Sequence, residues 1–197
     1  MSTIYLFRHG ITEGNKRRLY YGSTDIPLIE EGIEAIRERR EAGIYPDTEG
    51  FKIITTDLCR TEQTLFEMYG REVPHATDPR MREFSFGEFE MKSYEELKDR
   101  EDYQAWITGD NWRNICPNGE SGEIMLNRSL EAMEDYIGTD CIIVCHGGVI
   151  AGLMLTWFPG DETAEHFYAW QPKPSEGYRI DFDDELKPIC YKKISLE

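Results

Sequence analysis

Three apolar segments of the sequence each run directly into arginine or histidine residues. They are "YLFRHG" near the N-terminus, "IITTDLCR" before the middle and "IIVCHGG" in the last third. If the segments are strands of one parallel sheet, their carboxyl ends lie at one edge, where such sheets bind ligands. The residues brought together would be Arg8, His9, Arg60 and His146. Two guanidiniums and two imidazoles at one edge would bind a tetrahedral dianion such as phosphate, because guanidinium N–H pairs match its oxygens.

Glycine residues follow both histidines. Gly10 comes after His9, and Gly147 and Gly148 come after His146. Glycine allows turns that bring the backbone close to a bound ligand, so Gly147 is a candidate for substrate contact. A single histidine is more often a structural hydrogen-bonding residue than a catalyst. The informative pattern is therefore the pair of histidines with their flanking arginines and glycines.

The elements that must position these residues alternate along the chain. Runs typical of buried strands occur at 4–7, 51–56 and 141–145, and helical patterns occur at 28–42, 57–69, 126–137 and 149–158. This alternation predicts an α/β fold in three layers, with a mainly parallel central sheet flanked by helices. Alternating apolar residues in 178–182, the turn "DDELK" and the run 188–194 predict a C-terminal hairpin. No linker or repeat interrupts the chain, so residues 1–197 are expected to form a single domain.

Residues 79–118 are rich in aromatic and charged side chains and are expected to form a cap inserted into this domain. Ser93 and Glu96 have the spacing of a capping box, which predicts one helix from there through Trp106. Two interpretations of the aromatic side chains stay open: a lid that stacks on a flat base and excludes water, or the packed core of a helical cap. These side chains are Phe84, Phe86, Phe89, Tyr94, Tyr103, Trp106 and Trp112.

The composition limits the classes of partner. The chain carries a net charge of −16, which disfavours a protein that coats nucleic acid or an anionic membrane, because clustered Lys and Arg hold those partners. Most of the 22 Lys and Arg residues nevertheless lie in the first half, which favours a local basic pocket for a small anionic molecule. The candidates for it are Arg8, Lys16, Arg17, Arg18, Arg60, Arg80 and Arg82.

The sequence also indicates a compartment. The N-terminal residues do not resemble a secretory leader, and the longest apolar run, 149–158, is about half of what spans a bilayer. Five cysteines at irregular spacing suit a reducing environment, so a cytoplasmic protein is expected. Neither HExxH nor paired CxxC occurs, and no metal or other cofactor is expected. The oligomeric state stays open, with a homodimer as one alternative.

The residues around His9 form a motif. Residues 8–15, RHGITEGN, resemble the RHGxTxxN signature of the histidine phosphatase superfamily, which includes the cofactor-dependent phosphoglycerate mutases. "TTDLCRTEQT", "MREFSFGEFE", "PNGES" and "CHGGVI" are similar to later segments of that family, in the same order. The resemblance covers residues 4–150 and implies a phosphoglycerate mutase-like fold.

This resemblance implies roles for individual residues. His9 would be the nucleophile and would carry a phosphohistidine intermediate. The phosphoryl oxygens would be held by Arg8, Arg60 and a protonated His146. Glu83, in "MREF", would protonate the leaving oxygen and then deprotonate the attacking water. Such a reaction would be a metal-independent hydrolysis of a phosphomonoester.

Several segments look most like the α-ribazole phosphatase branch of the family, namely "LYYGSTDIPL", "FGEFEMKSYEEL" and "PNGES". Asn15, from the RHGxTxxN signature, would add a neutral donor to the bound phosphoryl group. By the likeness to the α-ribazole phosphatase branch, Tyr21 and Gly22 would contact the substrate, which would be α-ribazole 5'-phosphate or another small phosphorylated metabolite. The chain lacks the extra helical sequence by which the mutases keep water from the phosphorylated enzyme, and this favours hydrolysis. Two alternatives stay open: a bisphosphoglycerate-dependent phosphoglycerate mutase, and a non-catalytic binder of phosphorylated ligands.

Overall fold

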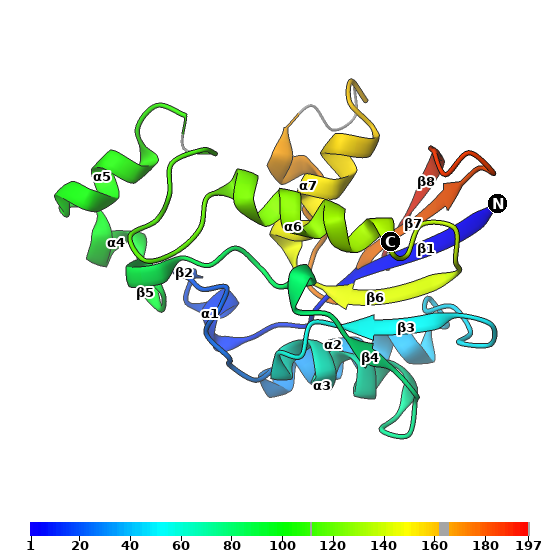
Figure 1. The fold of residues 1–197 in the computed structure, drawn as a ribbon. Coiled ribbons are helices and arrows are strands. Elements are labelled where there is room, and N and C mark those ends of the chain that lie inside the picture. Colours follow the sequence, from blue (N-terminus) through cyan, green and yellow to red (C-terminus); the bar gives the residue numbers. More distant parts are fainter. Residues whose placement is uncertain (111, 162–165, 197) are drawn as a thin grey trace.

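The central sheet has six strands in the order β4-β3-β6-β1-β7-β8 (Figure 1). This computed structural model describes residues 1–110, 112–161 and 166–196. The first four strands in that order run parallel, β7 is antiparallel to β1, and β8 is antiparallel to β7. The mainly parallel sheet and the C-terminal hairpin predicted from the sequence are confirmed. The strands are β1 (Ser2–Arg8), β3 (Lys52–Thr55), β4 (Ala76–Thr77), β6 (Cys141–Cys145), β7 (Gly177–Phe182) and β8 (Pro188–Ile194).

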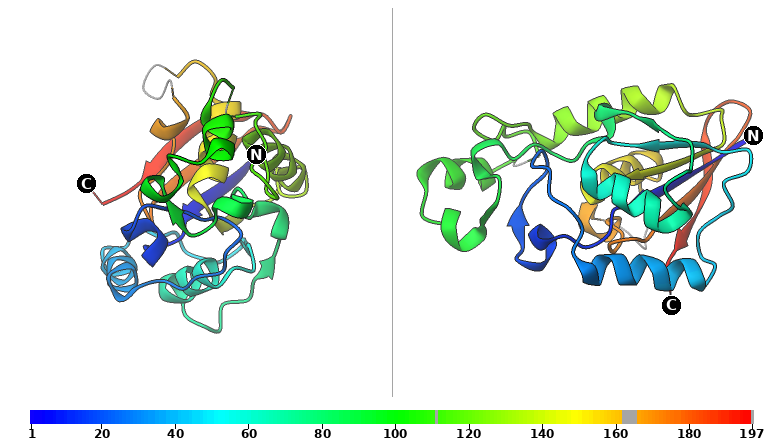
Figure 2. Two further views of the ribbon diagram at one scale, coloured as in Figure 1. Left: turned by 90° about the vertical axis from the view of Figure 1, so that its left-hand side faces the viewer. Right: turned by 90° about the horizontal axis from the view of Figure 1, so that it is seen from below.

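Helices cover both faces of the sheet because its central strands are apolar on both sides. Successive residues of a strand point to opposite faces. In β3, Ile53 packs with the core residues of α2 and α3, whereas Ile54 packs with those of α6 and α7. Figures 1 and 2 show the two helix pairs on opposite sides of the sheet, so the predicted three layers are confirmed. The helices are α2 (Glu30–Glu41), α3 (Cys59–Tyr69), α6 (Gly122–Glu134) and α7 (Gly147–Trp157).

The ends of the long helices follow local signals. Gly70 closes α3 with a φ of 94°, and Gly43 follows α2 with a φ of 69°, a region that glycine enters without strain. The prediction for α2 began too early, because Leu28 lies before the helix and donates its N–H to the side chain of Gln63. Within the described residues, every helix is too short or too polar to cross a bilayer.

The short elements of the cap lie beyond the carboxyl ends of β1, β3 and β6 (Figure 1). There β5 pairs with β2, which joins the cap to the segment that follows β1. The elements of this region are α1 (Glu13–Lys16), β2 (Leu19–Tyr20), η2 (Gly87–Phe89), β5 (Lys92–Ser93), α4 (Tyr94–Leu97) and α5 (Glu101–Ile107). Two further single turns are η1 (Pro79–Met81) and η3 (Phe167–Ala169).

The prediction of one helix from residue 93 through Trp106 is wrong, although the capping box that starts it is present. Leu97 and Tyr103 are both buried, at 0% and 1% exposure. Six residues apart in one continuous helix, their side chains would point about 120° apart, so one narrow buried face could not hold both. The break between α4 and α5 lets both side chains reach the core.

Candidate active site

The two histidines meet at the carboxyl edge of the sheet. β1 and β6 are neighbours with Arg8 opposite Cys145, so the residues that follow each strand emerge side by side. The His9 N–H donates to the Cys145 carbonyl at 3.0 Å, and the centroids of the His9 and His146 rings lie 5.2 Å apart. Both residues are buried, His146 completely. The structure therefore brings together two imidazoles that are far apart in the sequence.

A backbone carbonyl decides which nitrogen of His9 carries the proton. Nδ1 lies 2.7 Å from the carbonyl oxygen of Gly10, and because a carbonyl can only accept, the proton is on Nδ1. Burial, and then the positive charges of Arg60 and Arg8, hold the pKa of His9 well below its usual range. The ring is therefore neutral at pH 7, and the lone pair of Nε2 is available for nucleophilic attack.

His146 is held by a residue that directly follows β3. Its Nε2 lies 3.0 Å from Oγ1 of Thr56, while Nδ1 is buried without a hydrogen-bond partner among the described residues. Burial, followed by the positive charge of Arg60, holds the pKa of His146 well below its usual range. The protonated His146 expected from the resemblance is thus not the form of the ligand-free site, because burial and a nearby guanidinium disfavour a second positive charge.

Backbone carbonyls hold the two arginines of the site. Arg60 donates from Nη1 to the Thr24 carbonyl at 2.9 Å and from Nη2 to the Gly22 carbonyl at 2.6 Å. Arg8 donates from Nη1 to the Pro172 carbonyl at 2.9 Å. The Nε atoms of both arginines are buried without a hydrogen-bond partner among the described residues. Buried guanidinium donors without a partner are what an oxyanion ligand would satisfy.

Glu83 reaches the same site from the segment that follows η1. Its Oε2 accepts the N–H of Gly148 at 2.9 Å, in the first turn of α7, and its Oε1 accepts the N–H of Phe84 at 3.0 Å. These two hydrogen bonds fix the direction in which the carboxyl group points. Glycine is needed at 148, because a Cβ atom there would lie 3.1 Å from Cδ of Glu83 and would overlap Oε1. The first turn of α7 thus binds the carboxyl group of Glu83, and His146 is the N-cap residue of the same helix.

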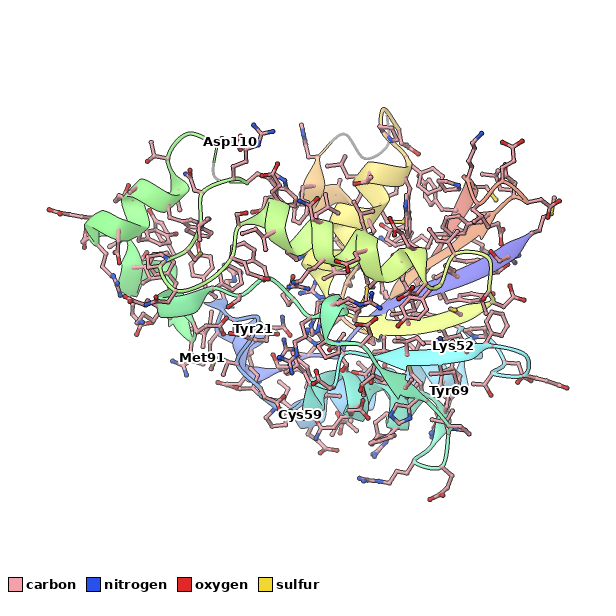
Figure 3. The ribbon with its side chains drawn as sticks, in the orientation of Figure 1. Tyr21, Lys52, Cys59, Tyr69, Met91 and Asp110 are labelled. Atoms are coloured by element: carbon pink, nitrogen blue, oxygen red, sulfur yellow. The ribbon has the colours of Figure 1, made fainter. Side chains whose placement is uncertain are left out.

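Asn15 and Tyr21 complete the polar part of the site. The side-chain oxygen of Asn15 accepts the N–H of Thr12 at 3.0 Å, which leaves its amide nitrogen as a donor for the cavity that it lines. The hydroxyl groups of Tyr21 and Thr12 are 2.7 Å apart. The guanidinium of Arg60 lies 5.1 Å from the centroid of the Tyr21 ring, a cation–π distance. Figure 3 labels Tyr21, which lies directly after β2 at the cap end of the sheet.

Two of the expected substrate contacts lie behind the site. Gly22 gives its carbonyl to Arg60 and its N–H to Glu90, and a Cβ atom there would overlap the carbonyl oxygen of Phe84. Gly147 packs against the side chain of Gln171. Neither glycine is among the described residues that line the cavity. Their small size serves close packing around the site, and a substrate contact by either glycine stays a prediction.

The basic pocket is smaller than the sequence suggested. Of the candidate basic residues, Arg8, Arg18 and Arg60 line the cavity. Three of the others form ion pairs elsewhere: Arg80 with Asp78 and Asp135, Arg82 with Asp57, and Lys16 with Glu31. These three side chains are therefore directed to carboxylates and not to the cavity.

The site opens into a cavity of about 900 Å³, one side of which is polar and the other aromatic and aliphatic. The two interpretations of the cap aromatics apply to different residues. Phe84, Phe86, Trp106 and Trp112 line the cavity. Phe89 and Tyr103 are buried in the core, and Tyr94 is 52% exposed. The cap therefore supplies both an apolar wall of the cavity and its own packed core.

Two residues that the sequence analysis did not single out hold the site in place. Thr56, the partner of His146, follows the end of a strand, and the strand-end rule that indicated the histidines could have found it. Arg128 on α6 donates at 2.6–2.9 Å to three backbone carbonyls of residues 80–83 and to both carboxylate oxygens of Glu120. It ties the segment that carries Glu83 to α6, and no local pattern indicates this, because those carbonyls lie at least 45 positions away.

Comparison with known proteins agrees with this geometry. The family described as the histidine phosphatase superfamily (branch 1) matches residues 4–189. The adenosylcobalamin/alpha-ribazole phosphatase of Salmonella typhimurium (strain LT2) is 31% identical over 159 residues, 77% of each chain. The probable phosphoglycerate mutase GpmB of Enterobacter sp. (strain 638) is 30% identical over 165 residues, 79% of this chain and 74% of that one. The crystal structure of the alpha-ribazole phosphatase from Shigella flexneri has a TM-score of 0.83 at 25% identity and covers 98% of this chain and 96% of its own. This chain therefore belongs to the histidine phosphatase superfamily.

Proposed function

We propose that this protein hydrolyses phosphate monoesters through a phosphohistidine formed on His9. The observation that carries the proposal is the neutral His9 ring, which keeps its proton on Nδ1 and is close enough to Arg60 and Arg8 for both charges to lower its pKa. Arg8 and Arg60 contact backbone carbonyls, so their charges are available to a phosphoryl group. A nucleophile with a free lone pair near guanidinium donors that lack a partner is the arrangement that phosphoryl transfer needs.

The proposed reaction has two steps. In the first, Nε2 of His9 attacks phosphorus, the P–N bond forms as the ester P–O bond breaks, and the leaving oxygen takes a proton from Glu83. In the second, Glu83 takes a proton from water, the water oxygen bonds to phosphorus, and the P–N bond breaks to release phosphate. Arg8 and Arg60 stabilise the phosphoryl oxygens in both steps. A dianion beside His146 favours its protonated form and so opposes the effect of burial.

We propose that the substrate is a phosphomonoester with a bulky aromatic group, and α-ribazole 5'-phosphate is the first candidate. The aromatic side of the cavity supports this, because Phe84, Phe86, Trp106 and Trp112 offer ring faces and edges on which a flat base can stack. The relatives from Salmonella typhimurium and Shigella flexneri carry α-ribazole phosphatase in their names. A small, fully polar substrate would leave this apolar wall uncovered.

The composition supports a cytoplasmic setting for this enzyme. All five cysteines are free, including the buried Cys141 and Cys145, which are the first and last residues of β6. Free thiols persist where the compartment is reducing. We therefore place the proposed reaction in the cytoplasm.

A phosphoglycerate mutase is the second candidate, and the relative named GpmB favours it. Both reactions can share a phosphohistidine, but the mutase returns the phosphoryl group to a second hydroxyl, whereas the hydrolase passes it to water. A non-catalytic binder is disfavoured, because the carboxyl group of Glu83 is held by two backbone N–H groups next to the phosphoryl site. Release of free phosphate therefore separates the candidates.

The experiment that tests the proposal follows the phosphoryl group. Rapid quenching with a labelled phosphomonoester should trap an acid-labile phosphoryl group on His9, and free phosphate should accumulate without a bisphosphoglycerate primer. His9→Gln should form no phosphoenzyme and release no phosphate. Strong dependence on the primer with little free phosphate would establish the mutase instead, and a fully active His9→Gln protein would refute the mechanism. A panel of α-ribazole, nucleotide, sugar and glycerate phosphates would identify the substrate class.

A further inference from the structure

Glu90 is a half-buried carboxylate that lies directly after η2 and is bound by neutral donors. It accepts hydrogen bonds of 3.0–3.1 Å from the backbone N–H groups of Gly22, Ser23, Thr24 and Phe86. The hydroxyl groups of Ser23 and Thr24 donate to it as well. Burial raises the pKa of Glu90, but these hydrogen bonds, led by the one from Thr24, outweigh burial and lower the pKa below its usual range. An ionised carboxylate therefore organises the whole of the loop 22–24.

The same loop binds Arg60. The carbonyls of Gly22 and Thr24 accept from Nη2 and Nη1 of Arg60, while the N–H groups of the same two residues donate to Glu90. Arg60 is fully buried, so these carbonyls determine where its guanidinium points. The backbone of the loop therefore connects the Glu90 carboxylate to the Arg60 guanidinium.

We propose that Glu90 is a positioning residue that sets the orientation of the Arg60 guanidinium through the loop 22–24. The proposal rests on the proposed function only in that Arg60 binds the phosphoryl oxygens. Glu90 acts through the backbone, since Arg60 bonds to the loop carbonyls and not to the carboxylate. A misplacement of about 1 Å in such a positioned group is enough to cost about 100-fold in rate, so the support of the loop has functional weight.

The test is a double-mutant cycle between Glu90 and Arg60, with the affinity for inorganic phosphate measured by calorimetry. Glu90→Gln replaces one acceptor oxygen by an NH2 group. Because this group cannot accept hydrogen bonds from the backbone N–H groups that it faces, the loop 22–24 must shift. We expect this change to weaken phosphate binding about tenfold or more, the scale of one hydrogen bond to a charged group. In the Arg60→Ala background the same change should cost less than about twofold, because the group that it misdirects is gone.

A role of Glu90 in general stability predicts a different result. Equal losses of affinity in both backgrounds, or no loss in either, would overturn the proposal. Thr24→Val, which removes a single hydroxyl donor to Glu90, is the milder variant if Glu90→Gln fails to fold, and its smaller loss should also vanish with Arg60→Ala. Asp181→Asn is the matched control: this carboxylate also accepts from side chains, but at the far end of β1, and its loss should leave phosphate affinity unchanged.

This cycle is independent of the chemical step. Binding of inorganic phosphate requires no phosphohistidine, so the coupling between Glu90 and Arg60 is measurable whether or not His9 is phosphorylated. A protein that shows the expected coupling but never carries label on His9 would refute the proposed function and support the role of Glu90. Label on His9 together with additive effects of the two substitutions would support the proposed function and refute the role of Glu90.

Discussion

Gly148→Ala changes one methyl group at the point where helix α7 meets Glu83. The new Cβ would lie 3.1 Å from Cδ of Glu83 and overlap Oε1, so the carboxyl group must leave the 2.9 Å hydrogen bond from the Gly148 N–H. A hydrogen bond to a charged group contributes about 1.5–3 kcal/mol, which corresponds to a loss of about 10- to 150-fold in rate. Because alanine is a good helix former and the obstacle is the end of a flexible side chain, the protein itself should remain folded.

The assay compares kcat/KM for two substrates, since this constant reports the steps up to cleavage of the ester bond. An alkyl phosphate needs a proton on its leaving oxygen, so its kcat/KM should decrease by the full factor of about 10 to 150. A nitrophenyl phosphate, whose leaving group departs as the anion, should change less than about threefold, because the proton donor is not needed. Gly152→Ala is the control, because it adds a methyl to the same helix and cavity but meets no part of Glu83: its nearest contact is a side-chain methyl of Leu126, at 3.2 Å. Equal losses for both substrates, or none for the alkyl phosphate, would refute the role given to Glu83.

Three further outcomes are expected. Burial holds the pKa values of His9 and His146 below that of an unfolded chain, about 6.5, so the unfolded state binds protons first as the pH falls. As the pH decreases from about 6.5, the unfolding free energy of the ligand-free protein should therefore decrease by up to about 1.4 kcal/mol per pH unit for each histidine. His146→Gln should reduce this slope of unfolding free energy against pH, measured by urea titrations at several pH values. An unaltered slope would contradict the reasoning. Arg128→Lys keeps the positive charge but loses the guanidinium N–H groups that bind three backbone carbonyls. This change should lower kcat about tenfold, while the affinity for phosphate, measured by calorimetry, should change less than about twofold. Trp106→Ala should raise KM for an aryl phosphate and not for glycerol phosphate, whereas exposed Tyr94→Ala should alter neither; a parallel rise for both esters would argue against the aromatic wall.

The sequence by itself determined the architecture and the centre of the site. Strand and helix patterns are written in residues close along the chain, and the parallel-sheet rule then requires consecutive strand ends to share one edge. The convergence of Arg8, His9 and His146 follows from that rule, since β1 and β6 pair in register up to these residues. The capping box at Ser93 was equally readable, because its two partners are only three positions apart.

Only the tertiary structure decided the protonation of the site and the supports behind it. The neutral state of His146 depends on how completely it is buried and on a guanidinium from another element, and neither is visible in its local sequence. The approach of Glu83 to α7 joins residues 65 positions apart, and the clamp formed by Arg128 joins residues 45 or more apart. The break between α4 and α5 likewise arises because Leu97 and Tyr103 must both be buried in the same core. Burial and long-range hydrogen bonds are properties of the packed molecule, so local patterns cannot encode them one residue at a time.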